Sequence, residues 1–253
     1  MNIISAKNIT YKVKDKTILS DINLSIPQGS FTSIVGMNGS GKTTLLNLIA
    51  NIIKATRGEI LIKNKDINSY SVRELAQNIS YVFQNNEVDF DFSALQIVMM
   101  GRTPYQKLLS TETPQDYSIC RKAMQETNTW HLRNRLINSL SGGERQRVFI
   151  ARSLAQNTDI ILLDEPVANL DLKHQIEIMK LLKDIQTKEN TTILIVLHDL
   201  SLALKYSDYV LALKDGQMRF FDTASKVLNK QNINSLFEIN AEILQDNNII
   251  IKD

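Results

Sequence analysis

The sequence predicts an α/β fold with a mainly parallel sheet and an inserted helical subdomain. Three observations predict this fold. A glycine-rich loop lies between a strand-like run and a helical run near the N-terminus. Strand-like and helical patterns alternate in the second half of the chain, as parallel sheets require. Between about Ser93 and Asn138 strand-like runs are absent and helical patterns take over.

The first elements read as short strands. Ile3–Tyr11 and Ile22–Ile26 alternate polar and apolar residues, and Pro27–Gly29 has the composition of a turn. Phe31–Val35 is a β-rich run that enters the glycine-rich loop, and a helix is expected from about Lys42 to Ile52. The chain therefore starts with strands and reaches its first helix only after the loop.

The later elements alternate in type. Strands are expected at Ile79–Phe83, Ile160–Leu163, Thr192–Leu197, Tyr209–Leu213 and Ile249–Ile251, and a helix is expected around Ala224 to Phe237. This pattern predicts a single domain over residues 1–240, with the helical subdomain inserted at about 93–155. Residues 241–253 are expected to form a short C-terminal extension.

The composition is that of an ordinary globular protein. The 253 residues are 43% hydrophobic and 22% charged, which fits one large α/β domain. A net charge of +2 is too small to indicate a nucleic-acid partner. The single cysteine, Cys120, cannot form an internal disulfide, which favours a cytoplasmic protein with this thiol as an apolar filler on a helix. No apolar run approaches the roughly 20 residues that cross a bilayer.

The glycine-rich loop matches the phosphate-binding pattern G-x-x-x-x-G-K-[ST]. Its members are Gly36, Met37, Asn38, Gly39, Ser40, Gly41, Lys42, Thr43 and Thr44. The glycines allow backbone N–H groups to surround phosphate oxygens, and the helix start adds partial positive charge. We expect Lys42 to reach the β- and γ-phosphates and the Thr43 hydroxyl to bind Mg²⁺. The loop therefore predicts the core of a P-loop NTPase.

The apolar run Ile160–Leu163 ends in two carboxylates, Asp164 and Glu165. Two adjacent acids at the end of a buried strand are costly unless a cation or hydrogen bonds compensate them. Ligands of open α/β sheets sit at that end of the strands. Asp164 can hold Mg²⁺ through water, and Glu165 can polarise the water that attacks the γ-phosphate. An ordinary acidic loop is the alternative interpretation, which the P-loop disfavours.

A second glycine-containing segment, Leu140–Gln146 with the sequence LSGGERQ, opens a helix whose apolar stripe includes Val148. Ser141 can cap this helix, and Gly142 and Gly143 leave N–H groups, so it is a second helix start able to bind an anion. The heptapeptide resembles the signature motif of ATP-binding-cassette (ABC) ATPases. The resemblance therefore implies the fold of an ABC ATPase: a P-loop NTPase core with a mainly parallel sheet, an N-terminal antiparallel β-subdomain and an inserted helical subdomain.

The resemblance to ABC ATPases extends from about Ile3 to Phe237 and implies roles for more residues. Gln84 resembles the Q-loop glutamine, which touches Mg²⁺ and the attacking water and senses the permease. His198 resembles the switch histidine that contacts the γ-phosphate. Tyr11 resembles the aromatic residue that stacks on adenine, and Asp171 resembles the D-loop aspartate at the dimer contact. Catalysis is thus expected to involve Gln84 and His198 besides the residues named above.

These residues also have simpler interpretations. Gln84 alone would be a polar loop residue, Tyr11 an ordinary strand residue and His198 a structural histidine at a strand end. His131 and His174 keep the structural interpretation. The sequence departs from common family forms at Met37, where proline is frequent, and at the pair Val167–Ala168.

The resemblance also implies an assembly. Two copies would close head-to-tail around two ATP molecules, with Ser141 of each copy facing Lys42 of the other. Two membrane permease subunits and, indirectly, an extracytoplasmic substrate-binding protein complete it at the cytoplasmic face of the membrane. Asp89–Met100 is apolar and aromatic, and exposed members such as Phe90 are expected to dock on the permease, although most should pack inside the helical subdomain.

Segments outside the universal motifs resemble those of iron-chelate importer ATPases. They are Val98–Tyr105, Asn169–Gln175, Leu197–Ala203 and Tyr206–Asp208. The resemblance implies an ATP-hydrolysing importer motor for ferric siderophores, or for haem or cobalamin. Zinc and manganese importer ATPases share the Gly101–Arg102 neighbourhood, so a bare metal ion is the alternative cargo. An exporter and a non-transport ABC ATPase are weaker alternatives. The chain has one motif set, no heptad run and little net charge, which disfavours the non-transport class.

Overall fold

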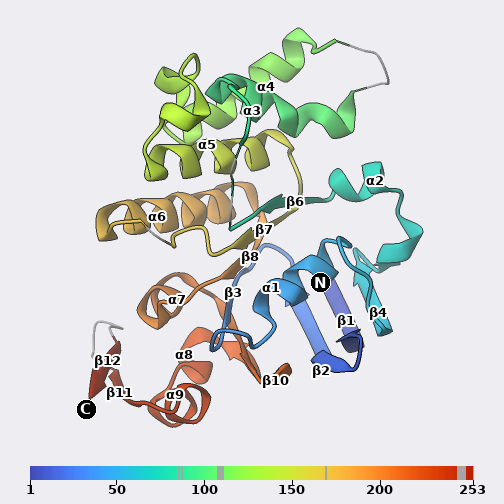
Figure 1. Cartoon of the computed structure of the whole chain (residues 1–253), viewed down its shortest axis with the longest axis vertical. Coiled ribbons are helices and arrows are strands. Elements are labelled where there is room, and N and C mark those ends of the chain that lie inside the picture. Colours follow the sequence, from blue (N-terminus) through green and yellow to red (C-terminus); the bar gives the residue numbers. More distant parts are fainter. Residues whose placement is uncertain (85, 87, 107–110, 169, 244–248, 253) are drawn as a thin grey trace. The chain divides into compact units, whose positions relative to one another are not determined.

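A computed structural model describes residues 1–84, 86, 88–106, 111–168, 170–243 and 249–252 (Figure 1). The chain divides into two compact units. The first unit comprises Met1–Ser69 and Leu182–Asp253, and the second comprises Tyr70–Leu181. Asn169, which the sequence places in the D-loop, and part of the expected C-terminal extension lie outside the described residues.

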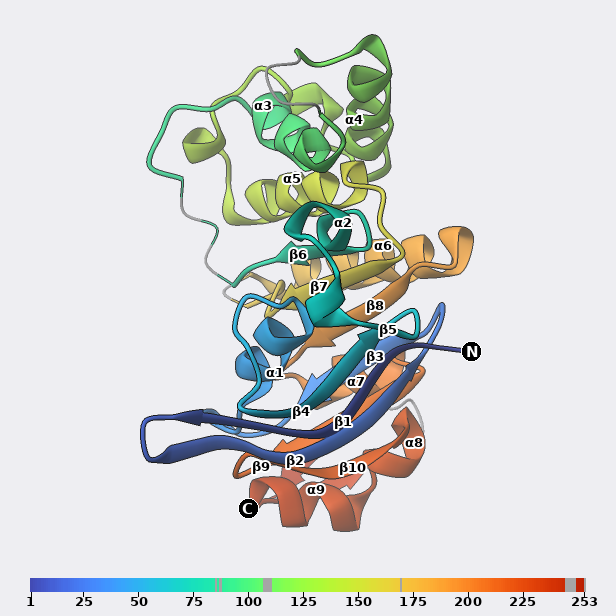
Figure 2. The ribbon, with the colours of Figure 1, turned by 90° about the vertical axis from the view of Figure 1, so that its right-hand side faces the viewer.

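An antiparallel sheet forms the N-terminal part of the first unit. It contains β1 (Asn2–Val13), β2 (Lys16–Pro27), β4 (Arg57–Ile62) and β5 (Lys65–Asp66) in the order β2-β1-β4-β5. Each neighbouring pair is antiparallel, and Figure 2 shows the long strands β1 and β2 side by side. Alternate residues of β2 are buried, which is the pattern of a sheet with one covered face. The predicted N-terminal antiparallel subdomain is confirmed.

The remaining strands of the first unit are mainly parallel. They are β3 (Phe31–Val35), β8 (Thr192–Val196), β9 (Tyr209–Lys214) and β10 (Gln217–Thr223), in the order β10-β9-β3-β8. β3 is parallel to both β8 and β9, whereas β10 is antiparallel to β9. Every residue of β3 and β8 is buried, as expected for parallel strands covered on both faces.

The helices of the first unit are short. They are α1 (Lys42–Ile49), α7 (Leu200–Tyr206), α8 (Ala224–Val227) and α9 (Lys230–Phe237). The expected single helix around Ala224 to Phe237 is two helices, because the Asn229 side chain caps a new start by accepting from the Asn232 N–H. β11 (Asn240–Ile243) and β12 (Ile249–Lys252) form an antiparallel pair at the end of the chain.

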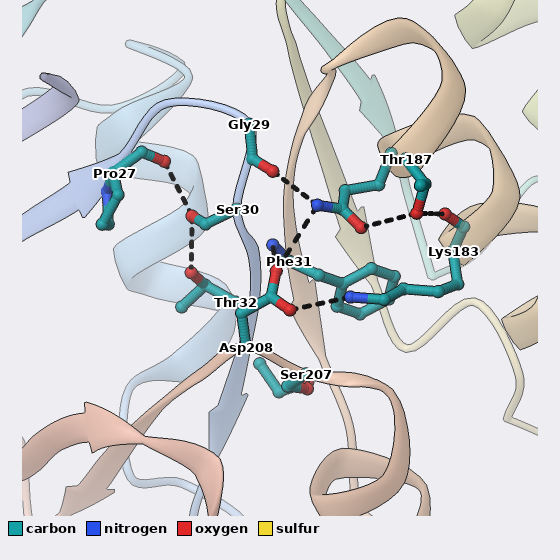
Figure 3. A network of polar contacts seen from close by, with 11 residues as sticks. Pro27, Gly29, Ser30, Phe31, Thr32, Lys183, Thr187, Ser207 and Asp208 are labelled. Carbon is teal, nitrogen blue, oxygen red and sulfur yellow. Dashed lines mark hydrogen bonds and ion pairs between the residues drawn. The ribbon is translucent and has the colours of Figure 1, made fainter.

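Asp208 fixes the start of β3, the strand that leads into the glycine-rich loop (Figure 3). Its Oδ2 accepts a hydrogen bond from the Phe31 N–H at 2.8 Å, and the Asp208 N–H donates to the Phe31 carbonyl at 2.8 Å. Its Oδ1 accepts from Lys183 Nζ at 2.8 Å. Lys183 belongs to α6 (Leu172–Glu189), whose residues from Leu182 on are part of this unit. The strand that carries the loop is therefore held at its other end by charged hydrogen bonds.

The second unit joins two parallel strands to a group of helices. β6 (Ile79–Val82) pairs with β7 (Ile160–Asp164). The helices are α2 (Val72–Ala76), α3 (Ala94–Met99), α4 (Pro114–Glu126) and α5 (Gly142–Ala155). Both α3 and α4 pack against α5 (Figure 1). The predicted helical insertion is therefore present in the fold.

A buried ion pair ties the helical elements together. Arg102 lies in the 3₁₀ helix η2 (Met100–Tyr105), and its Nε donates to Asp116 Oδ1 of α4 at 2.9 Å. Its Nη1 also donates to the Ala155 carbonyl of α5 at 2.7 Å. The hydrogen bond from Arg102 holds the pKa of Asp116 below its usual range. Cys120, on the same helix as Asp116, is buried, and burial raises the pKa of its thiol to about 12.

No helix among the described residues is long and apolar enough to cross a membrane.

Candidate functional site

The glycine-rich loop of the first unit closes around the Lys42 side chain. Lys42 is 6% exposed, and its Nζ donates hydrogen bonds to the carbonyls of Gly36 at 2.9 Å and Met37 at 3.0 Å. Gly41 has a φ of +99°, and a Cβ there would lie 2.5 Å from Leu19 Cδ2. Only glycine fits this position, because both the backbone conformation and the space exclude a side chain.

The start of α1 directly follows the glycine-rich loop. Gly41 at the N-cap provides no side-chain cap, and the first turn contains no acidic residue. The first N–H groups of a helix have no intrahelical acceptor. Ser40 is 3% exposed, and its Oγ has no hydrogen-bond partner among the described residues. A helix start with no side-chain cap next to a lysine fits the phosphate chain of ATP, and Thr43, which is expected to bind Mg²⁺, is an exposed residue of the same turn.

In the second unit the structure brings Gln84 and Glu165 together. Gln84 follows β6 and Glu165 follows β7, and the two strands are parallel neighbours. Parallel neighbours end at the same edge, so residues far apart in sequence meet there. Gln84 Nε2 donates a hydrogen bond to Glu165 Oε2 at 2.7 Å. The glutamine therefore fixes the orientation of the carboxylate that is expected to act on water.

The two carboxylates after β7 have different environments. Asp164 is the last residue of the strand and is 2% exposed, whereas Glu165 is partly exposed with a φ of +48°. A left-handed conformation at a residue with a side chain is uncommon and turns the chain sharply. Burial and, secondarily, the negative charge of Asp164 raise the pKa of Tyr81, so this phenol stays neutral beside the carboxylate. The pair thus offers one buried and one accessible acid, as metal binding and water activation require.

The start of α5 is capped by its own side chains. Ser141 Oγ accepts from the Glu144 N–H at 3.3 Å, and Glu144 Oε2 accepts from the Ser141 N–H at 2.9 Å. These bonds form a capping box, and Ser141 Oγ also donates to Glu144 Oε2 at 2.9 Å. The hydrogen bond from the Ser141 N–H leads the interactions that lower the pKa of Glu144. The capping role of Glu144 was not predicted, although Ser-x-x-Glu at the start of a helix is the sequence signal for a capping box.

Asp171 caps α6 and is hydrogen-bonded to His174. Its Oδ1 accepts from the His174 N–H at 3.0 Å, and its Oδ2 lies 2.7 Å from His174 Nδ1. These bonds, the one from the His174 N–H first, lower the pKa of Asp171. His174, expected to be structural, thus lies beside a predicted site residue. An Asp three positions before a His at a helix start is the sequence signal for such a pair.

The other predicted site residues are distributed over both units. Tyr11 lies in β1 opposite Leu19, and His198 is exposed between β8 and α7 in the first unit. Asn38 and Gly39 are exposed at the tip of the glycine-rich loop. Ser141, Gly142 and Gly143 belong to the second unit together with Gln84, Asp164, Glu165 and Asp171.

Comparisons with known proteins agree with these features. A family model described as ABC transporter matches residues 19–168. The petrobactin import ATP-binding protein FpuD of Bacillus anthracis is 37% identical over 243 residues, covering 96% of this chain and 89% of the relative. The iron(3+)-hydroxamate import ATP-binding protein FhuC of Bacillus subtilis is 37% identical over 246 residues, covering 97% and 91%. A dimeric ATP-binding cassette solved in a post-hydrolysis state with ADP and Pi has a TM-score of 0.75 at 33% identity, covering 87% of this chain and 98% of that one.

Proposed function

Because the chain belongs to the ABC transporter family, as an ATP-hydrolysing motor subunit, we propose that its cargo is a ferric siderophore and that its metal is Mg²⁺. The observation that supports this cargo is the similarity to siderophore import proteins over nearly the whole chain. Two relatives at 37% identity are named for the import of petrobactin and of iron(3+)-hydroxamate. Haem and cobalamin are the related cargoes that the same resemblance allows. A zinc or manganese ion is the alternative cargo.

The proposed hydrolysis uses residues from both units. The N–H groups at the start of α1 and the Lys42 ammonium hold the phosphates, and Thr43 and Asp164 hold Mg²⁺. Mg²⁺, when bound, neutralises charge on the β- and γ-phosphate oxygens. Glu165 polarises the attacking water as general base, and the hydrogen bond from Gln84 orients its carboxylate. His198 contacts the γ-phosphate.

The proposed assembly is a homodimer closed head-to-tail on ATP. The chain has one glycine-rich loop and one signature segment, and a two-fold axis lets each copy supply Ser141–Gly143 to the nucleotide of the other. The similar cassette solved as a dimer supports this arrangement. Tyr11 stacking on adenine and Asp171 at the dimer contact belong to the same proposal.

We also propose that two permease subunits bind the second unit at the cytoplasmic face of the membrane and receive cargo from an extracytoplasmic binding protein. The segment before α3 supports this surface. Phe90 is 70% exposed and Phe83 is 42% exposed, whereas Ile97 and Val98 are buried. Large exposed aromatic side chains are typical of sites that bind another protein.

Uptake by a deletion strain tests the cargo. A strain that lacks this gene and related ATPases should lose uptake of radiolabelled ferric siderophores, and wild-type protein should restore it. The Glu165→Gln variant, expressed at the same level, should not. Normal uptake of ferric siderophore, haem and cobalamin in the deletion strain, together with lost zinc or manganese uptake, would overturn the proposal.

A further inference from the structure

The first turn of α6 and Leu170 lie close to the signature loop of the same chain. A Cβ added at Gly143 would lie 2.8 Å from His174 Cδ2 and 3.1 Å from its Cγ. A Cβ added at Gly142 would lie 3.4 Å from Leu170 Cδ2. Gly143 is buried and does not have a positive φ. A side chain at this position would therefore displace the imidazole ring of His174, which lies in the volume that the side chain would fill.

The same ring is held in one orientation from its other side. Asp171 Oδ2 lies 2.7 Å from His174 Nδ1, and its Oδ1 accepts from the His174 N–H at 3.0 Å. The lowered pKa of Asp171 keeps the carboxylate ionised at neutral pH, so it only accepts hydrogen bonds. Nδ1 therefore carries the proton, and the opposite edge of the ring, with Cδ2 and Nε2, faces Gly143.

We propose that His174 is a positioning residue that joins the signature glycine Gly143 to the D-loop residue Asp171 within one chain. The inference rests on the proposed head-to-tail dimer, in which both elements meet the other copy. A rigid link between them means that the two elements are presented to the partner's ATP in one fixed arrangement. His174 acts through Gly143 and Asp171 and touches no nucleotide itself.

Three substitutions separate the two contacts of the ring. His174→Phe keeps a ring against Gly143 and loses the hydrogen bond to Asp171. His174→Asn keeps a short side-chain N–H for Asp171 and loses the ring. His174→Ala loses both contacts. If the link matters, each of the first two variants keeps part of the function and His174→Ala has the largest defect.

Hydrogen exchange of the nucleotide-free full chain measures the link without any partner. In His174→Ala the amides of residues 144 and 145, which donate to Ser141, should exchange at least about five-fold faster than in the parent, the low end of measured coupling between sites. The amides at the start of α1 serve as the internal reference and should not change. Unchanged exchange at 144 and 145 would overturn the inference, whether or not the dimer forms.

Closure on ATP measures the consequence. In a Glu165→Gln background, His174→Ala should raise the Mg-ATP concentration for half-maximal dimerisation about five-fold or more, with ATP binding to the single chain unchanged. The defects of Gly143→Ala and His174→Ala should be less than multiplicative when combined, because one removes the group that crowds the other. Faster exchange combined with a parent that never dimerises would support the link and refute the assembly. Closure of His174→Ala within two-fold of its parent would refute its role in closure.

Discussion

Two helix starts that look alike in sequence differ in how their N–H groups are satisfied. Both α1 and α5 begin after glycine-containing segments, and both were expected to bind an anion. α1 starts at Gly41 with no side-chain cap and no acid in its first turn. α5 starts at Ser141 within a capping box completed by Glu144. The difference teaches that α1 has no side-chain cap of its own beside the glycine-rich loop, whereas α5 is capped by its own side chains.

The largest expected effect falls outside both helix starts. Glu165→Gln should cut ATP turnover by about 10²–10⁴-fold, the usual contribution of a positioned general base. ATP binding should be retained, because the phosphate contacts at α1 are intact. Steady-state turnover and equilibrium ATP binding measure the two quantities separately. Near-normal turnover would remove Glu165 from the mechanism and leave water activation to another residue.

At α1 the comparison predicts dependence on Lys42. Lys42→Ala should lower kcat/KM by about 10²–10³-fold, since one charged donor to the phosphates is lost from a site built of donors. Fluorescent-nucleotide binding and turnover give the measurement. Lys180→Ala, at an exposed lysine of α6, is the matched control and should leave both unchanged. Equal losses in the two variants would show that overall charge, and not the loop, accounts for the effect.

At α5 the comparison predicts that loss of the Ser141 cap lowers the stability of the nucleotide-free protein. Ser141→Ala should lower the free energy of unfolding by about 1 kcal/mol, the typical value of an N-cap side chain. Ser141→Asn is the control, because asparagine caps as well as serine and should preserve stability. Urea unfolding of the nucleotide-free protein measures the change. Equal stability of the alanine and asparagine variants would break the contrast between the two starts.

The smallest expected effect is a pH dependence at the start of α5. The pKa of Glu144 is lowered in the folded protein, first by the bond from the Ser141 N–H. Its stabilisation is therefore complete above the usual glutamate pKa, near 4.3, and is lost as the pH falls through the lowered folded value. Amide exchange at 144 and 145 should become relatively less protected from pH 6 to about pH 3.5, and Glu144→Gln should remove that extra loss. An equal change at α1, which has no acid in its first turn, would contradict this prediction.

The sequence predicted the elements whose pattern is strong and local. Every residue of β3 and β7 is buried, and both strands coincide with the apolar runs that predicted them. α1 begins at Lys42, as predicted. β10 was missed because none of its residues is buried and its strand pattern is weak. α1 ends at Ile49, before the expected Ile52. Asn51 has a φ of +56°, and an α-helix does not continue through a residue with a left-handed backbone conformation.

Site residues that belong to a sequence motif could be predicted, whereas residues whose role depends only on packing could not. Lys42, Asp164 and Glu165 follow from motifs that carry their own chemistry. The contact of His174 with Gly143 joins residues 31 positions apart on different helices, and no local pattern specifies it. The role of Glu144 lay in a visible motif, but its capping function was not recognised there.

The single thiol of the chain has a practical consequence for these measurements. Cys120 is buried, and its raised pKa keeps it in the unreactive protonated form at neutral pH. A cysteine introduced at an exposed position, such as Tyr117 or Lys180, would therefore be the only accessible attachment point for a spin label or fluorophore. Distances between labels on two copies could then follow ATP-driven closure in the native background, with no cysteine-free parent to engineer first.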